Sequence, residues 1–207
     1  EVCGKTYDAL DLKNPYSTLS NSKPVIKKSK HYFFKLNNFK EFLNETVSEI
    51  SNQDPIKEKL KEWFDSGLKD WDISRDEPYF GFKIPNEDSK YLYVWLDAPI
   101  GYLSSIKNWC DSNNIDFNDF INDSKIVHFI GKDIVYFHLL FWPATLKAAN
   151  FPIPNEVYVH GFLTVEGEKM SKSKGNFILA DDALNYAEAD FFRYCLLYTS
   201  PSPRDTG

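Results

Sequence analysis

Three short stretches of the chain are almost continuously apolar and aromatic, and each one is followed by a turn that contains glycine or proline. These stretches are residues 91–96, 125–130 and 156–160. Runs of this length are typical of strands that are buried on both faces of a parallel sheet. Helical patterns follow the first two, from about Tyr102 to Cys110 and from Ile134 to Ala149. This alternation of strands and helices predicts an α/β domain built on a doubly wound sheet.

The polar segments after the three predicted strands are Asp97-Ala98-Pro99, Gly131-Lys132-Asp133 and His160-Gly161. In open α/β sheets, ligands bind outside the carboxyl ends of the strands. We therefore expect all three segments to line one crevice.

Two helices are predicted before this region. Residues 39–50 carry apolar side chains at helical spacing, with Asn38 as the N-cap. A second helix is predicted from Asp54 to Ser66, because Pro55 suits the first turn of a helix and Gly67 suits its end.

The remaining segments have weaker patterns. Residues 31–36 are aromatic and partly alternating, which predicts a strand. Residues 14–29 are rich in Pro, Ser, Asn and Lys, which predicts turns and exposed strands. Residues 71–76 are too short and mixed to predict a regular element. A further helical stretch is expected from Asp181 towards Tyr194.

Composition restricts the class of protein. The chain has 207 residues, of which 43% are apolar and 16% aromatic, so it can bury a core and could form either one large domain or one domain with a small insertion. Its net charge of −6 argues against a protein that coats nucleic acid by bulk attraction. The lysine-rich segment 23–30 is better explained as an exposed turn.

The three cysteines, Cys3, Cys110 and Cys195, are widely spaced and odd in number. This pattern fits a reducing compartment and no disulfide framework, and no secretory signal is present, so we expect a cytoplasmic protein. The longest apolar stretch, residues 134–146, contains His138 and is too short to cross a bilayer. Because the chain begins at Glu1 without an initiator methionine, we expect it to be a fragment.

The segment 161–176 carries the most specific candidate chemistry. It holds Lys169, Lys172 and Lys174, with Gly167 before them and Gly175 after them. Glycines accept positive φ, and lysine ammonium groups can neutralise the charge that builds up when a polyphosphate is cleaved. A solvated basic loop is the alternative interpretation.

The exact amino-acid sequence of this segment favours the catalytic interpretation over a solvated loop. Lys169-Met170-Ser171-Lys172-Ser173 resembles the KMSKS signature of class I aminoacyl-tRNA synthetases. Four further stretches resemble the methionyl-tRNA synthetases of this class: residues 71–76, 79–81, 95–102 and 128–138. The resemblance extends from Cys3 to about Tyr194.

The resemblance implies that the fold is the C-terminal half of a class I Rossmann-like catalytic domain with part of the connective, zinc-knuckle insertion. Residues 1–90 would be the remnant of this insertion, and residues 91–195 the second half of the catalytic domain with its KMSKS loop. Residues 196–207 match nothing expected of the family, and we interpret them as a sequencing or assembly artefact. The half with the HIGH signature is absent, so the fragment should be inactive alone. Cys3 would be an orphaned zinc ligand, and we expect zinc in the intact family protein only.

The implied activity is that of a methionine–tRNA ligase, which uses Mg²⁺ and ATP to form methionyl-adenylate and transfers the methionyl group to tRNA(Met), with no role for a membrane. The resemblance assigns catalysis to Lys172, assisted by Lys169, with Arg75 on the phosphate side. Besides Lys172, it assigns nucleotide binding to Gly131, Asp133, His160 and Gly161. It assigns the methionine pocket to Trp95, Ala98, Pro99, Tyr102, Asp133, Ile134, Phe137, His138 and Phe141.

A pocket of this composition suits methionine on physical grounds. The thioether of methionine is polarizable and packs well against aromatic edges. The Tyr102 hydroxyl and His138 would supply polar groups near the sulfur, since shape alone discriminates between aliphatic side chains by only ~1–3 kcal/mol. His138 lies one helical turn from Phe141, so both can face one cavity. For Phe129, ordinary core packing is the better explanation.

Two other functions remain open. One is a non-catalytic half-domain that binds nucleotide or tRNA. The other is a synthetase for leucine, isoleucine or valine, because those enzymes share the lysine loop.

Overall fold

The computed structural model describes residues 13–17, 20–51, 53–162, 164–165, 167–170 and 175–198, and the chain divides into the units Glu1–His31 and Tyr32–Gly207. In the first unit the described residues contain no helix or strand. They include a turn in which Asn21 N donates to Ser17 O over 2.8 Å. The predicted turns are confirmed there, whereas the predicted exposed strands do not form in the described part of that unit.

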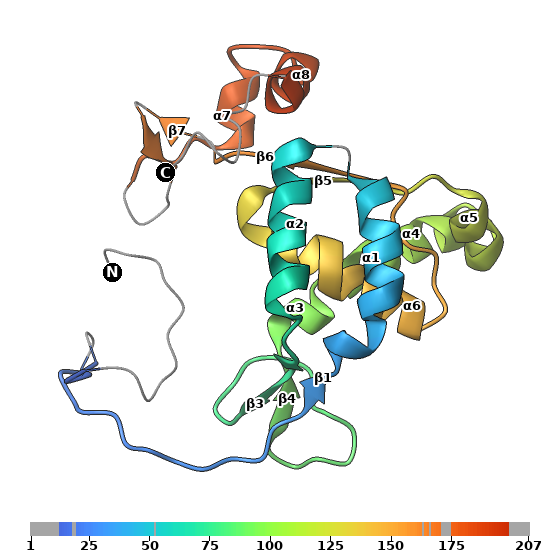
Figure 1. Ribbon diagram of the computed structural model, residues 1–207. Coiled ribbons are helices and arrows are strands. Elements are labelled where there is room, and N and C mark those ends of the chain that lie inside the picture. The colour runs from blue at the N-terminus through green and yellow to red at the C-terminus, as the bar shows by residue number, and fades with distance from the viewer. Residues whose placement is uncertain are drawn as a thin grey trace. The chain divides into compact units, whose positions relative to one another are not determined.

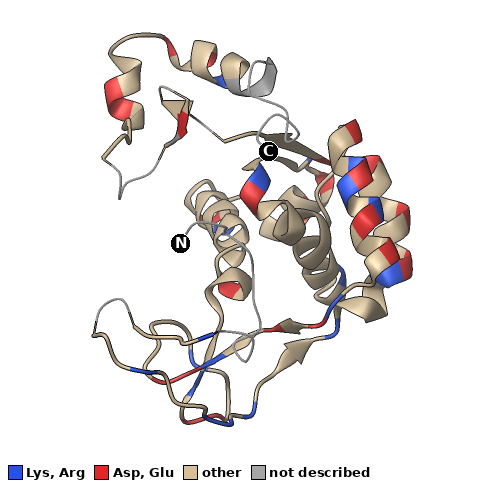
Figure 2. Ribbon diagram, turned by 60° about the vertical axis from the view of Figure 1, so that its left-hand side comes forward, with Lys and Arg blue, Asp and Glu red and all other residues tan. Residues whose placement is uncertain are grey.

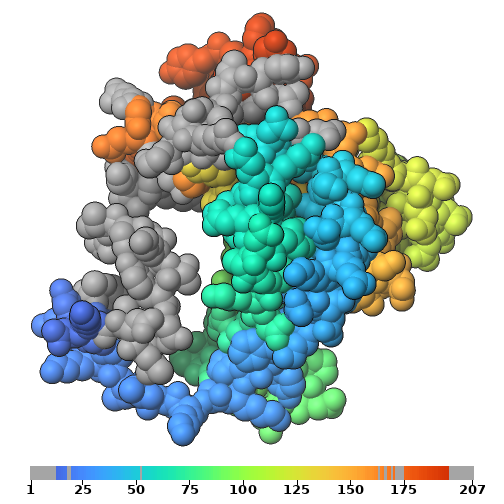
Figure 3. All heavy atoms as spheres, viewed as in Figure 1, coloured from blue at the N-terminus to red at the C-terminus, as the bar shows by residue number. Residues whose placement is uncertain are grey.

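In the second unit, two helices follow each other, α1 (Lys40–Ile50) and α2 (Asp54–Ser66). Both predicted helices are confirmed, and Gly67 ends α2 with a φ of 86°. The N-cap of α1 is Phe39 rather than the predicted Asn38, because a 3₁₀ turn, η2 (Leu36–Phe39), precedes the helix. Figure 3 shows the two helices in contact, and Figure 2 shows charges of both signs along α2. Their buried faces consist of Leu43, Val47 and Ile50 in α1 and Ile56 and Leu60 in α2.

Two short antiparallel ladders lie below these helices in the view of Figure 1. In one, β1 (Phe33–Phe34) pairs with β2 (Trp71–Asp72), and in the other, β3 (Ser74–Asp76) pairs with β4 (Lys90–Leu92). Residues 71–76 are therefore regular, contrary to our prediction. Their partners lie far away in the sequence, so a local pattern cannot reveal the pairing. The strand predicted for residues 31–36 is confirmed only at Phe33–Phe34.

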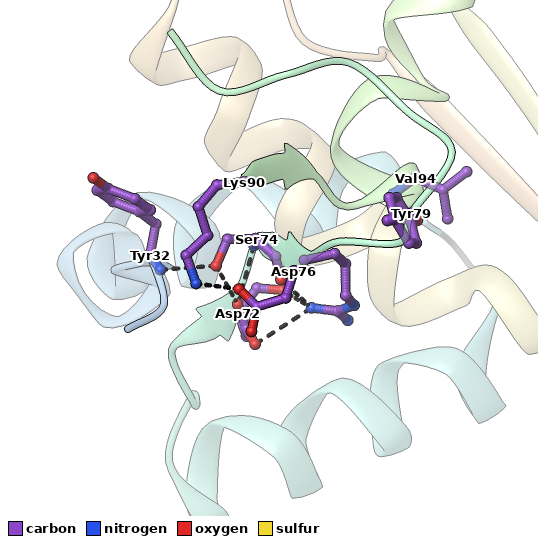
Figure 4. Close-up of polar contacts among 8 residues, drawn as sticks. Tyr32, Asp72, Ser74, Asp76, Tyr79, Lys90 and Val94 are labelled. Carbon is purple, nitrogen blue, oxygen red and sulfur yellow. Dashed lines mark hydrogen bonds and ion pairs between the residues drawn. The ribbon is translucent and has the colours of Figure 1, made fainter. Parts of the chain in front are cut away.

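Polar side chains hold these ladders together (Figure 4). The hydroxyl of the buried Ser74 accepts a hydrogen bond from Tyr32 N over 3.0 Å and donates one to Asp72 Oδ1 over 3.1 Å. Lys90, which is also buried, forms an ion pair with Asp76 across β3 and β4. The ladder residues are thus fixed by side chains as well as by backbone pairing.

The predicted buried strand 91–96 is wrong. β4 ends at Leu92, and the next residues form a helical turn, α3 (Val94–Asp97). Short apolar runs fit a strand and a helix equally well, so tertiary contacts decide. Here Val94 N donates to the hydroxyl of Tyr79 over 3.1 Å, at the point where the helical turn begins (Figure 4).

The other two predicted strands form a parallel pair. β5 (Val127–Gly131) and β6 (Glu156–His160) are in register from Val127 opposite Glu156 to Gly131 opposite His160. Before them lie α4 (Ile100–Ser112), which was predicted, and α5 (Phe117–Asp123), which was not. Within the described residues the parallel sheet has these two strands only. We predicted that three strand ends would line one crevice. Two of them, the ends of β5 and β6, are strand ends in the structure, and the third prediction, for residues 97–99, is wrong.

The crossover between β5 and β6 is helical from Lys132 to Ala148, close to the predicted helix 134–149, and residues 149–155 connect it to β6 without regular structure. It comprises the 3₁₀ turn η3 (Lys132–Ile134), the π-helical segment η4 (Phe137–Phe141) and α6 (Trp142–Ala148). Pro143 has no backbone N–H and cannot donate a hydrogen bond inside this helix. The turn before it is a π-turn, in which Trp142 N donates to Phe137 O, five residues earlier, and this wider turn accommodates the missing donor.

The main core lies between the inner face of β5–β6 and helices α1 and η4. Its buried members include Val47, Leu139, Leu140, Ile130, Val157 and Val159. The assignment of Phe129 to the core is wrong, because its side chain is 64% exposed and stacks on Tyr158, with ring centroids 5.2 Å apart. Successive strand residues face opposite sides, so Phe129 points away from the core that buries Ile130.

The last described segments are a hairpin and two helices. β7 (Thr164–Val165) pairs with β8 (Glu168–Lys169) around Gly167, whose φ is 81°. Gly175 also has a positive φ, of 73°, as expected for the glycines that flank the lysine loop. The predicted helical stretch forms α7 (Ala180–Leu184) and α8 (Ala189–Tyr198), interrupted between them. None of the described helices is long and apolar enough to span a bilayer.

Candidate functional site

The carboxyl ends of β5 and β6 bring polar groups together. Gly131 and His160 are opposite each other in the register, and Gly161 follows directly. A Cβ on Gly131 would lie 2.8 Å from Asp133 Oδ1, so any other residue at position 131 would require the Asp133 carboxylate to shift away from the strand end. His160 Nδ1 donates to Gly161 O over 2.7 Å. The structure therefore brings together Gly131, Asp133, His160 and Gly161, which the resemblance suggested for the nucleotide, whereas Lys172 lies outside the described residues.

A cavity lies against the outer face of this strand pair. Its volume is about 610 Å³, within the usual range for small-ligand sites. It is lined by Gln53, Phe129, Tyr158, Val159 and His160, and by Arg193 and Tyr194 of α8. His160 is the predicted nucleotide residue that borders this space.

Four aromatic side chains from three separate elements form an aromatic cluster, which consists of Trp71, Trp95, Phe137 and Phe141. Trp95 of α3 stacks on Phe137, with ring centroids 4.9 Å apart. Trp71 of β2 contacts Phe137 at 4.7 Å and Phe141 at 4.2 Å. The structure thus brings three predicted pocket residues together. Trp71 was not among the predicted site residues, since only its presence in a family-like stretch marked it.

Tyr102 of α4 and His138 of η4 form the polar part of this region. The Tyr102 oxygen lies 3.1 Å from His138 Nε2, and His138 Nδ1 lies 3.0 Å from Ile134 O. A carbonyl can only accept, so Nδ1 carries the proton. Burial of the His138 side chain, which is 0% exposed, lowers its pKa and favours the neutral ring. Nε2 is then an acceptor, and the Tyr102 hydroxyl donates to it.

His128 of β5 stands beside this pair and was also missed. Its ring centroid lies 5.3 Å from that of Tyr102 and 5.5 Å from that of His138. Burial, and secondarily the nearby His138, lowers the pKa of His128 to about 4. The sequence contained a signal, because β5 residues 128 and 130 share the inward face of a strand.

Arg75 is held within its own hairpin. Its Nη1 donates to Ser74 O over 2.6 Å and lies 3.3 Å from Asp72 Oδ2. The guanidinium carbon lies 3.9 Å from the centre of the Tyr93 ring, and Tyr93 contacts the edge of Trp71. Arg75 is thereby linked to the aromatic cluster, and its contact with phosphate stays a prediction.

The remaining predicted residues, Ala98, Pro99, Lys169 and Lys172, belong to none of the groups above. Ala98 is exposed and Pro99 is buried, and they form the corner between α3 and α4 rather than a strand end. Lys169 ends β8, and Lys172 lies outside the described residues. The approach of the lysine loop to the strand ends therefore stays a prediction.

The described part of the chain has no obvious metal centre. No group of three or more His, Cys, Asp or Glu side chains within it is arranged to hold a metal ion. Cys110 is buried and Cys195 is exposed, while Cys3 lies outside the described residues. The described His, Cys, Asp and Glu side chains therefore do not fit a tetrahedral zinc site.

Comparisons with known proteins agree with the geometry. A family profile described as "tRNA synthetases class I (M)" matches residues 1–207. The methionine–tRNA ligase of Vesicomyosocius okutanii subsp. Calyptogena okutanii (strain HA) is 52% identical over an alignment of 208 positions, which covers 99% of this chain and 38% of that protein. The methionine–tRNA ligase of Psychrobacter cryohalolentis is 53% identical over an alignment of 209 positions, which covers 94% of this chain and 30% of that protein. The chain spans about a third of the length of these curated relatives.

Solved structures give the same answer. Mycobacterium tuberculosis methionyl-tRNA synthetase in complex with methionyl-adenylate matches with a TM-score of 0.68 and 28% identity, covering 90% of this chain and 36% of that one. Its apo form matches with a TM-score of 0.57 and 25% identity, covering 71% and 30%. The predicted class I fold is therefore confirmed, and the chain belongs to the methionyl-tRNA synthetase family of class I tRNA synthetases.

Proposed function

We propose that a full-length protein carrying this chain is a methionine–tRNA ligase. It would activate methionine with Mg²⁺-ATP and transfer the methionyl group to tRNA(Met). The observation that carries this proposal is the aromatic cluster of Trp71, Trp95 and Phe137 beside the hydrogen-bonded pair Tyr102 and His138. The names of the relatives, methionine–tRNA ligases, and the bound methionyl-adenylate of a matching structure support it.

The aromatic cluster accounts for the affinity for a thioether. Sulfur gains about 0.3–1.5 kcal/mol from contact with an aromatic ring, and Trp95 and Phe137 present such rings. A thioether can only accept hydrogen bonds, weakly, and the Tyr102 proton is already donated to His138. We therefore assign methionine selectivity to ring contacts and to the fixed position of the Tyr102–His138 pair.

The strand ends account for the nucleotide side. Gly131 leaves room for the Asp133 carboxylate, which can accept hydrogen bonds from a ribose hydroxyl or from the methionine ammonium group. His160 and Gly161 complete this edge, and the cavity beside His160 offers the volume that a ligand needs.

The reaction requires positioning and charge stabilisation more than covalent protein chemistry. A methionine carboxylate oxygen attacks the α-phosphorus of ATP, the bond to the bridging oxygen breaks, and pyrophosphate leaves with its electron pair. Lys172, assisted by Lys169 and Arg75, would stabilise the charge on the departing pyrophosphate. A ribose hydroxyl at the 3′ end of tRNA(Met) would then attack the carbonyl carbon of the adenylate, forming the methionyl ester as AMP leaves.

Methionine-dependent ATP–pyrophosphate exchange by the full-length protein tests this proposal. We expect exchange with methionine and much slower exchange with leucine, isoleucine and valine, together with charging of tRNA(Met). Exchange that prefers another aliphatic amino acid would identify a different synthetase. Nucleotide or tRNA binding without any exchange would instead support a non-catalytic binding module.

A further inference from the structure

The side-chain amide of Gln53 binds both backbone groups of Val159. Gln53 Nε2 donates to Val159 O over 2.7 Å, and Val159 N donates to Gln53 Oε1 over 2.7 Å. The two residues are 106 positions apart in the sequence. Gln53 immediately precedes α2, and Figure 1 shows the start of this helix beside β6. The α1–α2 connection is thereby tied to the strand.

This contact supplies hydrogen-bond partners to the backbone of Val159 at an edge of the sheet. An edge strand presents backbone donors and acceptors that need partners. The amide of glutamine offers one acceptor and a donor in the same plane, as a neighbouring peptide unit does. At Val159, the Gln53 amide therefore makes the two hydrogen bonds that a neighbouring strand would make.

The position of the contact matters for the site. Val159 directly precedes His160, which lies opposite Gly131 at the end of β5. The Val159 side chain is buried in the core, so the Gln53 contact fixes the backbone at the last core residue before the strand ends. A shift of this backbone would move His160 and Gly161 relative to Asp133.

We propose that Gln53 is a positioning residue for the nucleotide side of the site. This role rests on the proposed ligase function. Gln53 acts through Val159, because its amide is engaged by the backbone of β6, and it keeps His160 and Gly161 in place for ATP. The aromatic cluster and the Tyr102–His138 pair lie on β2, α3, α4 and η4, whereas the Gln53 amide is bound to β6.

The same pair of strands contains a matched control. At the opposite, amino end, Asn155 Oδ1 accepts a hydrogen bond from Ile126 N over 2.7 Å. Asn155→Ala therefore removes an amide-to-backbone hydrogen bond from the same sheet, away from the strand ends that hold the candidate nucleotide residues. Comparing it with Gln53→Ala separates a loss of sheet stability from a loss of positioning.

The test is steady-state ATP–pyrophosphate exchange by the full-length protein, with amide hydrogen exchange at Val159 as the direct readout of the contact. In Gln53→Ala we expect faster exchange of the Val159 amide and a kcat/KM for ATP lowered about tenfold, since small displacements of positioned groups are costly. The KM for methionine should stay within about twofold of wild type, and Asn155→Ala should leave the kinetic constants for both substrates unchanged.

Gln53→Glu provides a second variant if Gln53→Ala does not fold. It retains an acceptor for Val159 N but directs a carboxylate at Val159 O, so a similar loss for ATP is expected. Wild-type kinetics in the Gln53 variants, or equal losses for ATP and methionine, would overturn the positioning role while leaving the ligase function intact. A wild-type protein without methionine-dependent exchange would overturn the ligase function and this role with it.

Discussion

Tyr102 donates its hydroxyl proton to Nε2 of His138, over a distance of 3.1 Å, because Nδ1 of the same ring is bound to the carbonyl of Ile134. Tyr102→Phe removes this donor and leaves a buried ring nitrogen without its protein partner. Tyr102 is 44% exposed, so water can replace part of the loss, and we expect a decrease of about 1 kcal/mol in the free energy of unfolding. The KM for methionine should rise, with a smaller effect on kcat.

Tyr158→Phe is the control for this change. The Tyr158 hydroxyl donates to Glu156 Oε2 over 2.9 Å at an exposed position outside the aromatic cluster. Removing it should alter neither the KM for methionine nor, measurably, the unfolding midpoint in urea. If the two tyrosine variants had the same KM for methionine, the Tyr102–His138 pair would have no part in recognising the amino acid.

The pKa of His128 predicts a specific dependence of stability on pH. Burial first, and then the nearby His138, lowers this pKa from 6.5 to about 4. Between these values the unfolded chain binds a proton at residue 128 that the folded chain does not. Stability is therefore unaffected by this group above pH 6.5 and falls as the pH decreases towards 4, by up to ~1.4 kcal/mol per pH unit.

Urea unfolding at pH 7.5 and pH 5.5 checks this dependence. The variant His128→Gln cannot titrate, so the difference in its unfolding free energy between the two pH values should be smaller than in wild type. His138 has a pKa shifted in the same direction by burial and remains present in the variant, which leaves a residual slope. Identical slopes in both proteins would contradict a buried, neutral His128.

Local sequence patterns predicted those elements whose ends carry their own signals. The bounds of α2 follow from Pro55 near its start and from Gly67 at its end, where a positive φ favours glycine. β6 was also predicted at its observed bounds, because its apolar run is followed directly by the turn residue Gly161. The bounds of α2 depend on interactions within a few residues, which the sequence displays directly, whereas β6 also needs its distant partner β5.

The predictions that proved wrong concern contacts between segments that are distant in the sequence. Residues 94–97 form a helix although they continue an apolar run, and Tyr79 supplies the oxygen that binds the Val94 amide. For the site, the resemblance named the residues but not their arrangement. Trp71 and Gln53 belong to elements far from η4 and β6 in sequence, so only the folded chain shows that they contact them.

His138→Ala tests the amino-acid specificity of the pocket. The change removes a fully buried ring and the acceptor of the Tyr102 hydroxyl, so the pocket loses both shape and the fixed position of Tyr102. We expect the ratio of kcat/KM for methionine to that for leucine to fall by about tenfold or more, the scale of a lost shape contact. The two ratios come from ATP–pyrophosphate exchange with each amino acid. An unchanged ratio would exclude His138 from the pocket.

Lys172→Ala distinguishes transition-state stabilisation from substrate binding. The lysine loop is expected to act on the charge that develops as pyrophosphate leaves, and removing one such charge commonly costs about 3–4 kcal/mol of barrier. The rate of methionine-dependent ATP–pyrophosphate exchange should therefore fall by about 10²–10³-fold, while the dissociation constant for methionine, measured by calorimetry, stays nearly unchanged. Lys107→Ala is a suitable control, since Lys107 is an exposed residue of α4 paired with Asp111. Equal losses of exchange rate and methionine affinity in Lys172→Ala would argue against a transition-state role, because a charge that acts only on the leaving group cannot weaken binding of the free amino acid.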